Sequence, residues 1–270
     1  MLKKYTHKSI TWIDSENPTT EEVRSLMEEY DISPTIAKEL QLPSYKEKIV
    51  VYKNYLYMVM HFPAFRHSHN NSQDQEIDFI VGKNFIITTR YETIDAFERF
   101  SKSFEVNDIL GKGIMEDHAG YVLYYIIKEL YRTMSDELDS MNDNLKCIEK
   151  NIFKGKEREM VTEISKANRD LINLNHIIVS HKEVLESLEN KNVVDTFFDP
   201  NFTDNFSKIL DEYYRIEDTL KNNIEFLKEL RDTNDSLLSS KQNETMKILT
   251  VITFLTLPIT VINDFFEINM

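Results

Sequence analysis

The sequence has a single cysteine and a shortage of basic residues. Among its 270 residues, 32 are Lys or Arg and 46 are Asp or Glu, so the net charge is −14. A nucleic-acid-binding protein needs a basic face to neutralise phosphates, and this balance therefore disfavours nucleic acid as a partner. Cys147 alone can form neither an intrachain disulfide nor a cysteine-based zinc site. The N-terminus lacks the apolar stretch of a signal peptide, so we expect the body of the protein to be cytosolic.

Glycine and proline are scarce in the second half of the chain. All five glycines precede residue 156, and the 57 residues between Pro200 and Pro258 contain neither Gly nor Pro. These residue types interrupt helices, so their absence permits one long helix. The distribution predicts a first part of mixed structure and a helical second part.

Residues 1–115 are expected to form a small α/β layer domain. Thr19 and Glu22 have the spacing of a capping box, which marks the start of a helix. A short helix is expected at 34–40, and helices resume after Thr93. The expected strands, rich in Val, Ile, Tyr and Phe, are residues 9–14, 49–52, 55–61, 77–81 and 85–89.

No enzyme motif is present in this part of the sequence. His61, His67 and His69 lie close together and suggest a zinc site, but a polar loop explains them better because no Glu-x-x-His pattern accompanies them. Gly111-Lys-Gly113 lacks the spacing of a phosphate-binding loop, and no nucleophile-elbow pattern occurs. We therefore expect a protein that is not an enzyme and has no organic cofactor.

Residues 116–200 are expected to form a long antiparallel helical hairpin that turns near Gly155. Apolar residues recur every seven positions in two offset series on each arm, which is the pattern of a packed helical seam. The first arm carries Ile127, Met134, Met141 and Ile148 with Tyr131, Leu138, Leu145 and Ile152. The second carries Ile164, Leu171, Ile178 and Leu185 with Ala167, Leu174, His181 and Leu188. His181 is expected to be a packed core histidine, and the other faces of the hairpin are acidic.

A third helix is expected to begin after Pro200, with a cytosolic stalk at 201–245 and a transmembrane segment at 246–267. Its stalk repeats apolar residues by seven, as in Phe206, Tyr213 and Leu220. From Ile248 to Ile262, 15 residues carry no charge, which is somewhat short of the roughly 20 residues that span a bilayer. A buried core helix is the alternative. However, a helix from 206 to 266 would be roughly 90 Å long, and no domain of this size can bury it.

One face of this last segment carries polar side chains, mostly threonines, together with one methionine and one leucine. Steps of three and four place them on one side of a helix, where a hydroxyl-lined stripe in a membrane suggests a polar path. Alternatively, the threonines simply bond to their own backbone. The residues of this stripe are Asn243, Met246, Thr250, Thr253, Leu257, Thr260 and Asp264.

The C-terminal motifs resemble those of the CorA family of divalent-cation channels. Residues 243–250 (NETMKILT), 258–260 (PIT) and 268–269 (IN) are similar to the family signatures N-E-x-M-K-x-L-T, P-[LI]-T and G-M-N at the same spacings. The order of an α/β domain, an acidic hairpin and a very long helix agrees with this resemblance along the whole chain. Two departures stand out: G-M-N is replaced by Glu267-Ile268-Asn269, and the chain ends one residue later, without the second membrane helix of family members.

The resemblance implies an α+β fold with an N-terminal α/β layer domain, a long acidic helical hairpin and one very long helix that continues into a transmembrane segment. It also implies a homopentamer in a lipid bilayer, in the cell (inner) membrane with the N-terminal domain in the cytoplasm. Such a channel would transport Mg²⁺, with Co²⁺ and Ni²⁺ as further ions, and would be gated by cytosolic divalent cations. Mg²⁺ is thus expected to be both the transported and the regulatory ion.

The same resemblance implies roles for individual residues. Asn269 would contribute to selectivity by bonding the waters of a hydrated ion, and the stripe residues together with Leu249 would line the pore. Met246 and Leu249 match a hydrophobic constriction. Asp232 matches a carboxylate ring near the cytosolic end, and Asp211 and Glu212 resemble regulatory metal-binding positions, although Lys208 occupies one expected acidic place. Two alternatives remain open: a zinc transporter of the same family, and a non-conducting membrane-anchored regulator that senses divalent ions.

Overall fold

The computed structural model describes residues 2–44, 46–63, 74–110, 118–188, 197–198 and 202–267. Within them the chain forms two compact units. The first unit comprises 1–140 and 171–221, and the second comprises 141–170 and 222–270. His67, His69 and Asn269 lie outside the described residues, and the side chain of Asp264 is likewise not described.

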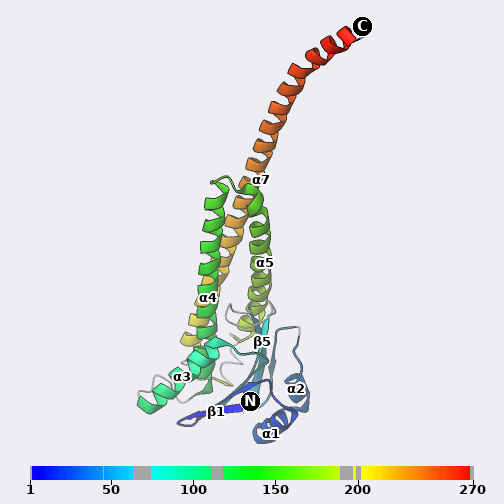
Figure 1. Ribbon diagram of the computed structural model, residues 1–270. Helices are drawn as coiled ribbons and strands as arrows, with labels where there is room; N and C mark the ends of the chain where they lie inside the picture. Colours follow the sequence, from blue (N-terminus) through cyan, green and yellow to red (C-terminus); the bar gives the residue numbers. More distant parts are fainter. Residues whose placement is uncertain are drawn as a thin grey trace. The chain divides into compact units, whose positions relative to one another are not determined.

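The first unit is built on a six-stranded sheet with the order β1-β2-β6-β5-β4-β3 (Figure 1). The neighbours β2 and β6 are parallel, and every other neighbouring pair is antiparallel. The strands are β1 (Leu2–His7), β2 (Ile10–Glu16), β3 (Lys48–Val51), β4 (Tyr55–Phe62), β5 (Gln75–Gly82) and β6 (Phe85–Arg90). Both hairpins expected from the sequence are confirmed, β3–β4 and β5–β6.

Strand β1 is absent from the expectations drawn from the sequence, and β2 begins at Ile10 and runs to Glu16 rather than ending at Asp14. The chain reverses between the two strands at Lys8, which has a φ of 51°. Strand β1 lies at the sheet edge and carries Lys3 and Lys4 on exposed positions. Charged edge strands protect a sheet from further pairing, and for that reason they lack the apolar pattern by which strands are recognised.

The sheet is covered on both faces, because its strands alternate apolar side chains between them. Helices α1 (Thr20–Tyr30) and α2 (Pro34–Glu39) pack on the face that carries Ile13, Tyr57 and Ile80. The Thr19–Glu22 capping box at the start of α1 is confirmed. On the opposite face, Trp12 packs against three phenylalanines of α3 (Asp95–Leu110), namely Phe97, Phe100 and Phe104.

Helices α4 (Ala119–Ile152), α5 (Glu157–Leu188) and α7 (Thr203–Glu267) make up the rest of both units. The heptad positions named in the sequence analysis are buried as expected, except that Met141 is half-buried. In the second unit α4 ends and α5 begins around Gly155, which has a φ of 87° that favours glycine. Lys241 of α7 bonds to Glu157 Oε2 at 2.6 Å and thereby ties α7 to the start of α5.

Candidate ion pathway

The C-terminal third of α7 is helical, and its side chains do not pack against the rest of the described chain. Every described side chain from Ser239 to Ile262 is exposed, although most of those after Lys247 are apolar. Among the described residues, α7 is the one helix long and apolar enough to cross a membrane, and none of its most apolar window is buried. The alternative of a buried core helix is therefore wrong for this chain. An apolar surface of this extent marks contact with lipid or with other protein chains.

The large apolar side chains of this segment point in all directions around the helix. A helix that is apolar all round matches a lipid or a protein environment better than water. Those exposed by more than half are Met246, Ile248, Leu249, Val251, Ile252, Phe254, Leu255, Leu257, Ile259, Val261 and Ile262.

The threonines of the segment bond to their own helix. The Thr250 hydroxyl donates to the carbonyl of Met246 at 2.8 Å, and the Thr253 hydroxyl donates to that of Leu249 at 2.9 Å. Thr260 donates to the carbonyl of Leu257 at 2.8 Å. The hydroxyl hydrogen is thus used within the helix, but each oxygen still has lone pairs that can accept a hydrogen bond. A hydrated cation presents water hydrogens, which are the donors that such a stripe can bind.

Pro258 lies inside α7, and the helix continues through it to Glu267. Proline has no N–H group, so the carbonyl of Phe254 loses its usual partner in the helix. The ribbon of α7 curves along this region (Figure 1). Because α7 is helical to Glu267, Asp264 shares the helix face of Leu257 and Thr260 by spacing.

The acidic residues singled out in the sequence are not gathered into a site within one chain. Asp232 is 65% exposed and lies 3.9 Å from Arg231 Nε. Asp211 is exposed, and Glu212 pairs with Arg215 one helical turn later. Among the residues that the structure describes, no group of three or more His, Cys, Asp or Glu side chains converges to hold a metal ion. Asn243 is exposed in the stalk.

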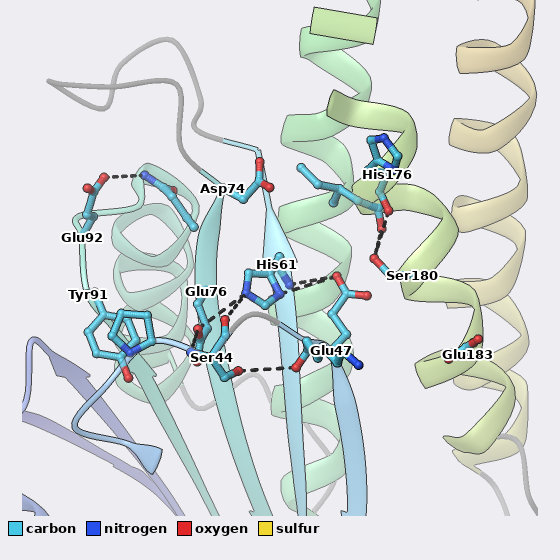
Figure 2. A pocket seen from close by; sticks show the side chains of 14 residues that line it. Ser44, Glu47, His61, Asp74, Glu76, Tyr91, Glu92, His176, Ser180 and Glu183 are labelled. Atoms are coloured by element: carbon cyan, nitrogen blue, oxygen red, sulfur yellow. Dashed lines mark hydrogen bonds and ion pairs between the residues drawn. The ribbon is translucent and has the colours of Figure 1, made fainter. Parts of the chain in front are cut away.

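The structure gathers a different set of polar side chains that sequence analysis did not recognise. His61 lies beside Glu47 and Glu76 (Figure 2), and His181 of α5 lies beside Glu47. From the sequence, His61 was considered only together with His67 and His69, and His181 was considered only as a core residue. Their partners are 14 to 120 residues away in the sequence, so no spacing pattern connects them.

Comparison with known proteins identifies the family. The model of the CorA-like Mg²⁺ transporter protein family matches residues 7–270. This chain belongs to that family. The Cobalt/magnesium transport protein CorA of Thermotoga maritima is 24% identical over 261 residues, which cover 96% of this chain and 73% of that protein. The protein of the same name from Methanocaldococcus jannaschii is 23% identical over 248 residues, covering 90% and 75% of the two chains.

Several solved structures share the fold of this chain. The complete CorA magnesium transporter of M. jannaschii superposes with a TM-score of 0.77 at 22% identity, covering 92% of this chain and 76% of that one. Full-length CmaX superposes with a TM-score of 0.80 at 15% identity, covering 94% and 76%. The cytoplasmic domain of ZntB from Vibrio parahaemolyticus gives 0.70 at 12% identity, covering 86% and 89%. The α+β fold expected from the sequence is therefore confirmed.

Proposed function

We propose that this chain is the subunit of a homopentameric channel that transports divalent cations, Mg²⁺ and also Co²⁺ and Ni²⁺, across the cell (inner) membrane. The main observation in support of this proposal is the exposed, apolar end of α7, which has a stripe of threonines along one face. Family membership and the names of the two CorA relatives support Mg²⁺ and Co²⁺ as the ions.

In the proposed assembly, residues 246–267 cross the bilayer and turn the stripe toward a central path. Mg²⁺ releases its waters reluctantly, so a pathway that bonds to those waters avoids the cost of removing them. The hydroxyl oxygens of Thr250, Thr253 and Thr260 are such acceptors. Met246 and Leu249 form the hydrophobic constriction at the cytosolic end, where loss of water blocks ions.

The part of the chain that we place in the cytoplasm supplies the negative charge that attracts cations. Five copies of a chain with a net charge of −14 sum to −70, a strong attraction for cations. Asp232 forms a carboxylate ring below the constriction, and Asn269 contributes to selectivity at the outer mouth. Divalent cations that bind at Asp211 and Glu212 between neighbouring subunits offset the repulsion of acidic faces and stabilise the closed state.

The test is ion flux into liposomes that contain this chain. The variant Thr250→Val keeps the shape of the side chain but removes a stripe oxygen, and we expect Mg²⁺ influx to fall several-fold. The matched control is Thr256→Val. Thr256 also donates to its own helix, at 3.1 Å to the carbonyl of Ile252, but it lies about 120° around the helix from Thr250.

Each outcome of this test decides between functions. Equal influx for wild type, Thr250→Val and Thr256→Val would contradict a pore role for the stripe. Flux of Zn²⁺ in preference to Mg²⁺ would favour the zinc transporter, and no flux of any divalent cation from well-inserted protein would favour the membrane-anchored regulator. Light scattering that detects only monomers in detergent at all concentrations would contradict the pentamer.

A further inference from the structure

The turn between α4 and α5 lies beside α7 in the second unit, next to the place where α7 runs on alone (Figure 1). We call residues 150–158, with the sequence KNIFKGKER, the hairpin tip. Lys241 of α7 holds it in place, because its Nζ lies 2.6 Å from Glu157 Oε2 and 3.4 Å from the carbonyl oxygen of Gly155. The hairpin tip is therefore attached to α7 at the level of Lys241.

This attachment places the hairpin tip close to the start of the apolar segment. Lys241 precedes Met246 by five residues, which is about 7.5 Å along a helix. The polar layer on each side of a bilayer is about 5–7 Å thick. If residues 246–267 cross the membrane as proposed, long side chains of the hairpin tip reach the lipid headgroups.

The backbone of the hairpin tip is well ordered by its own hydrogen bonds. The Gly155 N–H donates to the carbonyl of Ile152 at 3.0 Å, and the Lys156 N–H donates to that of Asn151 at 3.1 Å. With the positive φ of Gly155, these two bonds form the turn that commonly ends a helix and caps its last carbonyls. The side chains around the turn are thus presented by a fixed backbone.

Phe153 at this turn is 69% exposed. Outside residues 246–262, it is the most exposed aromatic side chain in the part of the chain that the structure describes. Its neighbours Ile152 and Met160 are buried, so the helices do have a core at this level, and Phe153 does not join it. Aromatic side chains are enriched where a membrane meets water, because the ring is apolar and tolerates a polar border.

The hairpin tip is basic in a chain whose net charge is −14. Its only carboxylate, Glu157, is already paired with Lys241. The cations are Lys150, Lys154, Lys156 and Arg158. Lys156 lies 3.9 Å from Glu159, whereas the side chains of the other three have no hydrogen bond or ion pair with any described residue. Three exposed cations around one exposed phenylalanine match a surface that is both anionic and apolar.

We infer that the hairpin tip docks on the membrane surface, where Phe153 enters the headgroup layer and the three unpaired cations bind the phosphates of anionic lipids. Basic clusters beside a membrane helix are attracted to anionic headgroups, and a partly buried aromatic ring adds to the binding. This inference rests on the proposed crossing of the bilayer by residues 246–267. Lys241 supports lipid as the partner, since it holds the cluster within reach of the membrane.

The test is quenching of tryptophan fluorescence by brominated lipids in vesicles that contain this chain. Trp12 is the single tryptophan and is fully buried in the first unit, so it adds a constant background. The variant Phe153→Trp puts the probe at the hairpin tip, in vesicles of equal parts phosphatidylcholine and phosphatidylglycerol. We expect quenching above the wild-type background, at least twofold stronger when phosphatidylglycerol carries the bromine than when phosphatidylcholine does.

Two controls test position and charge. Asn144→Trp puts the probe at an exposed site of α4, nine residues before Phe153 and about 13 Å farther along the helix, and should be quenched at most half as strongly. Combined with Phe153→Trp, the triple variant Lys150→Gln/Lys154→Gln/Arg158→Gln should lose the preference for phosphatidylglycerol. The triple variant Lys3→Gln/Arg24→Gln/Lys53→Gln removes the same charge from exposed positions of the first unit and should keep it.

Phe254→Trp separates this inference from the proposed function, because Phe254 lies in the apolar segment and is 80% exposed. Quenching of Phe254→Trp without quenching of Phe153→Trp would overturn the docking of the hairpin tip and leave the membrane crossing intact. No quenching of either would overturn both. Equal quenching of Phe153→Trp by the two brominated lipids would overturn the binding of anionic lipids. A blue-shifted emission that neither lipid quenches would show that protein covers the hairpin tip instead.

Discussion

His181 of α5 donates a hydrogen bond from Nε2 to the backbone carbonyl of His61 at 2.6 Å. Its Nδ1 lies 3.2 Å from the Tyr131 hydroxyl, which donates to it when the ring is neutral. The side chain is fully buried and also packs against Phe62 with ring centroids 4.9 Å apart. A single imidazole thus joins α4, α5 and the end of β4. The expectation of a packed core histidine is confirmed.

Replacing His181 with leucine is expected to destabilise the first unit. The change leaves the His61 carbonyl and the Tyr131 hydroxyl without a partner, which costs about 2–3 kcal/mol for buried groups. We expect the melting temperature to fall by roughly 4–12 °C. The control is His176→Leu, an exposed histidine on the same helix. A similar melting temperature for both variants would contradict the structural role of His181.

The burial of His181 also predicts that the folded chain loses stability in acid. Burial lowers the pKa of His181 to about 4, below its ordinary value of 6.5. Between pH 4 and pH 6.5 the unfolded chain binds a proton at His181 that the folded chain does not bind. The contribution of neutral His181 to the free energy of unfolding is therefore complete above pH 6.5, and it is lost as the pH falls toward 4. The loss is about 3 kcal/mol. The gap in melting temperature between wild type and His181→Leu should therefore narrow from pH 7.5 to pH 4. A gap that stays constant would contradict this assignment.

For Asp78 we predict the opposite dependence on pH, with stability falling as the pH rises. It accepts hydrogen bonds from the hydroxyls of Tyr57 and Thr89, both at 2.8 Å. Burial, together with the charge of Glu76, raises the pKa of Asp78 to about 7. The folded chain then keeps a proton that the unfolded chain loses above about pH 4, so stability from this group is lost as the pH rises toward 7.

The variant Asp78→Asn cannot ionise and should therefore gain stability relative to wild type between pH 4 and pH 8. The gain is of the order of 4 kcal/mol. Melting temperatures across this range provide the measurement, and Asp139→Asn on the exposed face of α4 is the control. An equal response of the two variants to pH would show that Asp78 is already ionised in the folded chain.

The buried ion pair between Arg90 and Asp14 stabilises the parallel pair of strands β2 and β6. Arg90 Nη2 lies 3.0 Å from Asp14 Oδ2, and the side chains are 3% and 6% exposed. Removing one partner leaves the other charge buried, which costs about 3–5 kcal/mol. We expect Arg90→Met to lower the melting temperature far more than Arg99→Met, whose exposed pair with Glu129 contributes little. The double variant Asp14→Asn/Arg90→Met should recover part of the loss.

Asp264 provides a prediction for transport. It follows Leu257 and Thr260 on the proposed pore face, at a position where the resemblance to the CorA family leads us to expect glycine. Five carboxylates around a narrow path attract divalent cations, and a charge in a membrane segment usually has a function. Asp264→Asn should weaken divalent-cation uptake, and Asp264→Gly should shift it toward ordinary family behaviour. Uptake unchanged in rate and ion preference for both variants, at equal expression, would exclude a pore role.

The elements predicted correctly are those whose signals are local. The β3–β4 and β5–β6 hairpins, the Thr19–Glu22 capping box and the heptad seams depend on residues a few positions apart, and each is present in the structure. The long α7 follows in the same way from the absence of helix breakers between Pro200 and Pro258. Strand β1 was missed because an exposed edge strand needs no apolar alternation.

By itself, the sequence determined the order of the elements apart from β1, the family and the apolar end of α7, because periodicity, breakers and short motifs act between near neighbours in the chain. Only the tertiary structure decided which polar groups meet. His61 contacts Glu76 because β4 and β5 pair in one register, and His181 reaches His61 across 120 residues because α5 packs beside the sheet. Such contacts depend on how helices and strands pack. That packing brings the carboxylates of Glu47 and Glu76 within 4 Å of the His61 ring, although the two residues lie far apart in the sequence.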